Sequence, residues 1–299
     1  MRRGWQAVLV LAVAGATSAC ARPALDLPAA APPAPSSPVN SSGALPVPAP
    51  RNDSVSVGSG SVLPSVGQCI DATRQTVPCT NPHQGEITLV SELPAGLPSS
   101  MPDDSTLTRE ALPRCRTALG DYVGSKDADA TSVQAWAFWP QQQDWAAGRR
   151  WLVCAVTQVD SVGNPTTVAG SIHNGLAGSG FGKYQTCTVS SPSRDQQLRF
   201  GRCDGPHLGE AMPDVQSLGR STDPMPPTEQ INAIARDRCG KELINYLGAT
   251  NRADVTFTWR APDTRQAWSQ GFTNLICYAE SERTVNGRLR GIGTGPLPT

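Results

Sequence analysis

The sequence lacks an excess of either charge, because 25 lysines and arginines balance 25 aspartates and glutamates. Beyond its first residues it also lacks a cluster of basic residues. Clustered cations are what bind the phosphate backbone of a nucleic acid, through the release of its counterions. We therefore expect no nucleic-acid partner.

The short motifs of hydrolases and of zinc sites are also missing. The chain contains no Gly-x-Ser-x-Gly, His-Glu-x-x-His or Ser-x-x-Lys motif, each of which places a nucleophile or a metal beside a base. It contains neither a tight Cys-x2-Cys pair nor a His-x3-His pair, which are usual in zinc sites. We therefore expect no catalytic residue, no metal and no other cofactor.

An internal repeat is the main feature that the sequence does contain. A Cys-x-x-Pro-His-x-x-Glu motif occurs twice, and the next cysteine follows 36 residues after the motif's cysteine in both copies. A Trp-x-x-Gly-x5-Cys motif closes each copy, and the exit Gly175–Ser179 is matched with Gly287–Gly291. Two related modules in tandem are thus predicted. The repeated positions are Cys79 and Cys203, Cys115 and Cys239, and Trp145 and Trp268.

Each module is predicted to be α+β, with one main helix packed on a small antiparallel sheet. Apolar residues at helical spacing indicate the helix, from Thr108 to Tyr122 in the first module and over 228–247 in the second. Short runs rich in β-branched residues on either side indicate strands. The modules are assigned to 64–182 and 183–292, and the last seven residues, 293–299, to a flexible tail.

The nine cysteines divide into four in each module and Cys20 alone. Four cysteines allow three pairings, and the sequence does not choose among them. We favour one bridge between adjacent strands and one from the helix to the last strand, which would stabilise a module by about 3 and about 4 kcal/mol. The favoured pairs are Cys69 with Cys79, Cys115 with Cys154, Cys187 with Cys203, and Cys239 with Cys277.

Residues 1–20 have the basic start, short apolar run and small residues of a secretory signal peptide. Cys20 lies where a bacterial lipobox places its acylated cysteine, although Ala19-Cys20-Ala21 also fits an ordinary cleavage site. Residues 21–63 are rich in Pro, Ala, Ser and Gly, and we expect a disordered tether. These features predict an exported lipoprotein on the outer face of the cell membrane, or alternatively a secreted protein.

Two kinds of residue are candidates for binding a partner. One His-Glu pair follows a proline in each module, where the histidine is expected to fix a turn; catalysis or metal binding is the alternative. One tryptophan lies in a polar loop of each module, where core packing is expected and stacking on a sugar ring is the alternative. The six candidates are His83, Glu86, Trp145, His207, Glu210 and Trp268.

The first module resembles the actinobacterial septum formation domain in its motifs Val66–Cys69, Val77–Glu86, Pro140–Cys154 and Gly175–Ser179 and in its helical Cys115. The second module resembles this domain more loosely. The resemblance implies an exported, membrane-attached envelope protein that is associated with the division septum and has no known reaction. We expect a non-catalytic scaffold that binds an envelope protein or a cell-wall glycan. The alternatives are an envelope hydrolase or metal-dependent enzyme, and a peptidoglycan binder.

Overall fold

The computed structural model describes residues 62–250 and 252–299, which all belong to the unit of the chain that spans Ser37–Thr299. The predicted signal peptide, Cys20 and nearly all of the predicted tether lie outside these residues. Among the helices that the structure describes, none combines the length and the apolar character needed to cross a bilayer.

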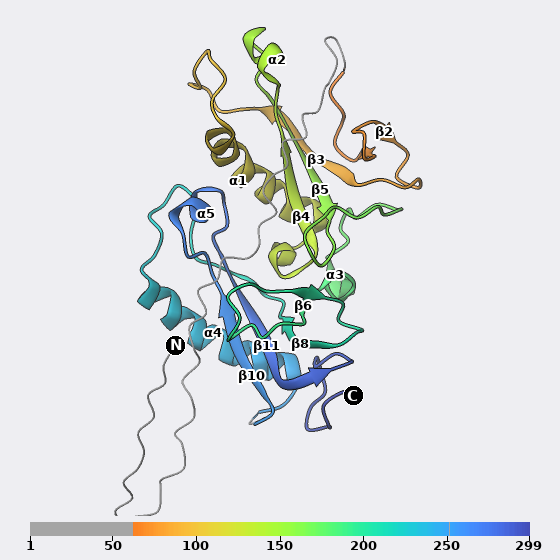
Figure 1. The fold of residues 1–299 in the computed structure, drawn as a ribbon, viewed down its shortest axis with the longest axis vertical. Helices are drawn as coiled ribbons and strands as arrows, with labels where there is room; N and C mark the ends of the chain where they lie inside the picture. Colours follow the sequence, from red (N-terminus) through yellow and green to blue (C-terminus); the bar gives the residue numbers. More distant parts are fainter. Residues whose placement is uncertain (1–61, 251) are drawn as a thin grey trace, which may run out of the picture. The chain divides into compact units, whose positions relative to one another are not determined.

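The first module is an antiparallel sheet with one long helix, as predicted (Figure 1). The strand order is β2-β1-β3-β5-β4. Helix α1 begins earlier than the sequence pattern indicates, because the Asp103 side chain caps it by accepting a 2.7 Å hydrogen bond from the Thr106 amide. The elements are β1 (Cys69–Ile70), β2 (Thr76–Val77), β3 (Gly85–Glu92), α1 (Asp104–Val123), η1 (Lys126–Ala130), β4 (Val133–Phe138), α2 (Gln142–Ala146) and β5 (Trp151–Gln158).

The second module repeats this arrangement. Its main strand order is β10-β11-β8-β6-β7, with β9 paired to β11. The short elements η2 (Gly178–Gly180) and α3 (Phe181–Tyr184) connect the two modules. The remaining elements are β6 (Cys187–Thr188), β7 (Phe200–Gly201), β8 (His207–Ala211), β9 (Gln216–Ser217), α4 (Thr228–Leu247), β10 (Val255–Arg260), α5 (Arg265–Ser269) and β11 (Asn274–Val285).

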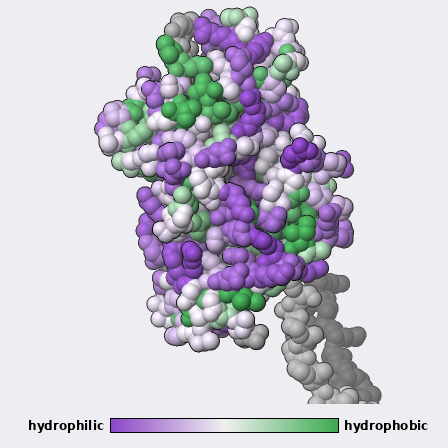
Figure 2. All heavy atoms as spheres, turned by 180° about the vertical axis from the view of Figure 1, so that it is seen from behind, coloured by the Kyte–Doolittle hydropathy of each residue, from purple (hydrophilic) through white to green (hydrophobic). Residues whose placement is uncertain are grey.

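Each long helix packs one face against its sheet. In the first module Leu107 and Ala111 of α1 share an apolar cluster with Leu152 of β5. In the second module Ile231 and Ala235 of α4 belong to the corresponding cluster. The surface is more polar than these apolar clusters. Figure 2 shows a largely hydrophilic face with hydrophobic residues in separate patches.

Four disulfides connect these elements in the pairing that the sequence favours. Two short bridges, with sequence separations of 10 and 16, close the start of each sheet. Two long bridges, with separations of 39 and 38, tie the long helix to the last strand of the module. Since a bridge removes more freedom from the unfolded chain when its loop is longer, each long bridge contributes about 4 kcal/mol. The pairs are Cys69–Cys79, Cys115–Cys154, Cys187–Cys203 and Cys239–Cys277.

The segments that end the two modules correspond to each other, but in a different alignment from the predicted one. The amide of Asn174 donates to the carbonyl of Tyr122 over 2.9 Å, and the amide of Gly291 donates to that of Tyr246 over 2.8 Å. Asn174 and Gly291 also share a left-handed backbone, with φ of 55° and 71°. The predicted match of Gly175 with Gly287 was therefore wrong, because it followed a short glycine pattern instead of the bonds to the helix end.

Candidate functional site

Glu210 of β8 is the centre of a fully buried polar cluster. Its Oε1 accepts from Nε2 of His207 over 2.9 Å and from the Leu289 amide over 2.8 Å. Its Oε2 accepts from the Tyr246 hydroxyl, which in turn accepts a 2.6 Å hydrogen bond from Nε2 of Gln185. The exposed fraction of the Glu210 residue is 0%. Both carboxylate oxygens are therefore used inside the protein.

Glu86 of β3 forms a related cluster in the first module. Its Oε1 accepts from the Tyr122 hydroxyl and from Oγ of Ser171, both over 2.5 Å. Its Oε2 accepts from the Ile172 amide over 2.8 Å. The common plan is a buried glutamate, a helix tyrosine and a backbone amide of the exit segment. In each module these bonds join the sheet, the helix and the exit segment.

The two histidines hold the turns before their strands. Nδ1 of His83 lies 2.8 Å from the Asn81 carbonyl, and Nδ1 of His207 lies 2.7 Å from the Gly205 carbonyl. A carbonyl only accepts, so each Nδ1 carries a proton. Only His207 also contacts the glutamate of its own motif. Both histidine residues are buried, at 2% and 0% exposed.

Opposing effects set the pKa of the His207 imidazole. Burial lowers the pKa of the His207 imidazole, but the hydrogen bonds to Glu210 and Gly205, with the charge of Glu210, outweigh burial and raise this pKa above its ordinary value. Burial and the neighbouring Glu210 raise the pKa of Tyr246 well above its ordinary value. The contact with Glu210 therefore favours the protonated form of His207, and Tyr246 is a neutral phenol that donates to Glu210.

Two groups of potential metal ligands coincide with these clusters. Cys187, His207 and Glu210 have ligand atoms within 4.8 Å of one another, as do Cys69, Cys79 and Glu86. Every cysteine in both groups belongs to a disulfide. A metal binds the thiolate, which a disulfide sulfur cannot supply. In the oxidised protein these residues therefore do not fit a metal site.

The two candidate tryptophans are packed inside the modules. Trp145 is 1% exposed and its Nε1 donates to the Pro98 carbonyl over 3.3 Å. Trp268 is 3% exposed and its Nε1 donates to the Asp223 carbonyl over 2.8 Å. The Arg150 guanidinium covers the Trp145 ring at 3.8 Å from its centroid. Neither indole offers an open face on which a sugar ring could stack.

The tyrosines of the two buried clusters were not among the predicted site residues. Tyr122 follows Glu86 by 36 residues, and Tyr246 follows Glu210 by the same distance. This repeated spacing was available in the sequence and would have identified both residues. Gln185 gives no such signal, because it belongs to the second cluster alone.

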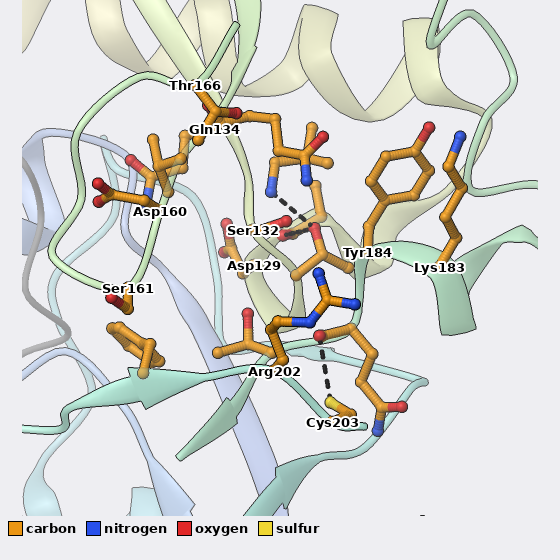
Figure 3. A pocket seen from close by; sticks show the side chains of 18 of the residues that line it. Asp129, Ser132, Gln134, Asp160, Ser161, Thr166, Lys183, Tyr184, Arg202 and Cys203 are labelled. Carbon is orange, nitrogen blue, oxygen red and sulfur yellow. Dashed lines mark hydrogen bonds between the residues drawn. The ribbon is translucent and has the colours of Figure 1, made fainter. Parts of the chain in front are cut away.

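A cavity of about 600 Å³ lies between residues of the two modules, and Gln185 of the Glu210 cluster belongs to its lining (Figure 3). One wall consists of 131–136, at and before β4, and another consists of 200–204, in and after β7. Polar side chains such as Gln134 and Asp160 and the cation Lys183 line it. None of the six candidate residues from the sequence belongs to this lining.

Comparison with protein families finds one match. The family described as septum formation matches residues 39–136 and 66–277, and the two overlapping ranges are consistent with tandem copies. Comparisons with curated proteins and with solved structures found no match.

Proposed function

Since the chain belongs to the septum formation family, we propose that it is a non-catalytic, septum-related protein that acts outside the membrane as a binding or scaffold module. Membership of the family supports the septum-related role. The four disulfides support a location in the envelope or outside the cell, because disulfides persist in oxidising compartments. A lipid on Cys20 would hold the protein at the membrane, with 21–63 as the tether.

The non-catalytic part of the proposal rests on one observation: the carboxylate oxygens of the two glutamates already accept hydrogen bonds from the protein. Glu86 and Glu210 are buried, and each accepts three hydrogen bonds from the protein. A general base must reach a proton of its substrate within hydrogen-bond distance. These carboxylates already hold tyrosine, amide and neighbouring side-chain donors, and their bonds stabilise the modules.

The test is a strain depleted of the protein and supplied with variants. Replacing His83 and His207 by glutamine together should leave septum formation intact at a temperature where the variant remains folded. Circular dichroism of the purified variant gives that temperature. A folded double variant that fails to support septa would contradict the proposal and favour the hydrolase alternative.

The proposed membrane attachment has a separate test. The intact mass of protein extracted from membranes should include a diacylglyceryl group on Cys20 and eight cysteines that resist alkylation without reduction. The variant Cys20→Ser should be released from the membrane while its four disulfides still form. An unmodified Cys20, or a mature chain that begins after it, would contradict the anchor and favour secretion.

A further inference from the structure

One wall of the cavity between the modules follows β4 and the residues before it, and another includes β7 and the residues after it. Six consecutive residues, 131–136, and five consecutive residues, 200–204, line it. Successive side chains of a strand point to opposite faces of its sheet. A cavity lined by every residue in turn therefore opens onto the backbone edge, where amide and carbonyl groups are offered.

Strand β4 is an outer strand of the first sheet. It pairs with β5 from Val133 to Phe138, and within the described part of the chain no other strand pairs with it over this length. The Val159 amide donates to the Ser132 carbonyl, which fixes the alternation along the ladder. The backbone groups of Ala135 and Ala137 then point away from β5, and Ala135 lines the cavity.

The start of this edge is already extended by a neighbouring segment. Thr131 forms an antiparallel bridge with Gln185. The Ser132 amide donates to the Tyr184 carbonyl over 2.8 Å, and the Thr186 amide donates to the Ala130 carbonyl over 3.1 Å. The edge thus accepts an antiparallel partner at its start. The Val133 amide donates to Oγ1 of Thr131 over 3.1 Å, and among the described residues β5 is the strand that pairs with Val133–Phe138.

The charges around the cavity are unequal at its two sides. Arg116 is paired with Asp129, and Arg202 is paired with Asp204. Lys183 lies 4.9 Å from the Tyr184 ring. In the part of the chain that the structure describes, no ion pair with a carboxylate is found for Lys183. Figure 3 shows Lys183 and the carboxylate of Asp160 on opposite sides of the cavity.

Arg288 strengthens the positive side. Its Nη2 donates to the Gly182 carbonyl over 2.6 Å, next to Lys183 in the chain, and its Nη1 donates to Oε1 of Gln185. Both partners are neutral, so the charge of Arg288 is not balanced by them. Arg288 thus contacts Gly182 and Gln185, on either side of Lys183 in the chain, and both cations line the cavity, with the Asp204 carboxylate also near Arg288.

We propose that this cavity binds an extended peptide segment of a partner protein, which pairs antiparallel with β4 and carries an acidic side chain toward Lys183 and Arg288. Strand addition supplies affinity through backbone hydrogen bonds, and side-chain contacts supply specificity. The inference rests on the proposed binding function and adds the class of partner and the site.

The experiment selects random decapeptides displayed on phage against the folded full chain. Peptides with alternating β-branched residues and an acidic residue should be enriched. Their dissociation constants should rise about tenfold with Lys183→Glu, which reverses one exposed charge at the site. The matched control is Lys241→Glu, because Lys241 is also exposed and lies on α4 outside the cavity lining. Affinity for the control should not change.

Two further measurements distinguish strand addition from other binding. Methylation of alternate peptide amides should abolish binding, because it removes the donors that face β4. Hydrogen exchange of the Ala135 and Ala137 amides should slow when the peptide is bound. Failure to enrich peptides over the Lys183→Glu variant, or equal binding of methylated peptides, would overturn the proposal. So would binding of an N-acetylglucosamine tetramer in this cavity with no peptide enriched.

The peptide site and the proposed function fail in distinguishable ways. If peptide selection fails while the double histidine variant still supports septa, only the peptide site is overturned. If that folded variant fails to support septa, the non-catalytic function is overturned whatever the peptides do.

Discussion

The hydroxyl of Tyr122 donates a 2.5 Å hydrogen bond to Oε1 of Glu86, 36 residues earlier in the chain. The second module repeats this relationship between Tyr246 and Glu210. In both modules the bond connects the long helix to the strand that carries the glutamate of the repeated motif. The duplication therefore preserves a buried polar contact along with the disulfides, and the contact fixes how helix and sheet meet.

Replacing Tyr246 by phenylalanine should lower the free energy of unfolding by about 1–3 kcal/mol, because one buried carboxylate oxygen loses its donor. Tyr122→Phe should cost less, since Tyr122 is only half-buried and Glu86 keeps the donors from Ser171 and Ile172. Urea denaturation followed by tryptophan fluorescence measures both changes.

Tyr184→Phe is the matched control for these two variants. Tyr184 is also buried, and its contact with Lys183 is made by the ring, which phenylalanine keeps. We expect a change of less than about 0.5 kcal/mol for this variant. A Tyr246→Phe variant as stable as the control would show that the Glu210 cluster does not stabilise the second module.

The stability of the second module should depend on pH through His207. The pKa of His207 is raised in the folded state, so the imidazole binds its proton more tightly there than in the unfolded chain. This contribution is complete below the unfolded pKa of about 6.5 and is lost as the pH rises through the folded pKa. The free energy of unfolding, measured in urea from about pH 6 upward, should therefore fall through that window.

Two histidine variants test the origin of this pH dependence. His207→Gln should remove most of the slope, because glutamine does not titrate. His83→Gln should retain it, since the His83 ring bonds to the Asn81 carbonyl and the glutamate contact belongs to His207. Equal loss of the slope in both variants would contradict the assignment to His207.

The sequence predicted the repeated modules, their helices and their sheets, but not the buried clusters or the cavity. The sequence left three disulfide pairings open in each module, and the favoured one, based on cysteines placed on a helix and on strands by local patterns, is the one in the structure. In the Glu210 cluster the repeated spacing could have indicated Tyr246, but the contacts of Gln185 and of the Leu289 amide are set by packing, which no local pattern reports. The cavity joins 131–136 with 200–204. These are different elements of the two modules, so the repeat could not indicate it.

Trp145 and Trp268 should behave as core residues. Replacing either by alanine should lower the free energy of unfolding by about 3–5 kcal/mol, because each leaves a large cavity in a packed module. Trp136→Ala is the control, since Trp136 is only half-buried, and should cost less. A Trp145→Ala variant with normal stability but weakened cell-wall binding in a pulldown would instead support the glycan alternative.

Arg116 should couple the stability of the two modules. Its Nη2 lies 2.6 Å from Asp129 of the first module, its Nε donates to the Gly271 carbonyl of the second over 2.8 Å, and its guanidinium lies 3.9 Å from the Phe272 ring centroid. The Arg116 side chain is 13% exposed, so solvent screens these contacts weakly. Arg116→Ala should cost about 2 kcal/mol or more and separate the unfolding of the modules in calorimetry.

Arg220→Ala supplies the comparison that makes the Arg116 prediction specific. Arg220 also pairs with an aspartate, Asp223, but its side chain is 83% exposed. An exposed pair of this kind contributes between about 0 and 1 kcal/mol, so the calorimetric trace should keep its wild-type shape. If Arg116→Ala and Arg220→Ala give the same trace, then Arg116 does not join the modules, and the shape of the cavity beside it must depend on other contacts, such as the bridge between Thr131 and Gln185.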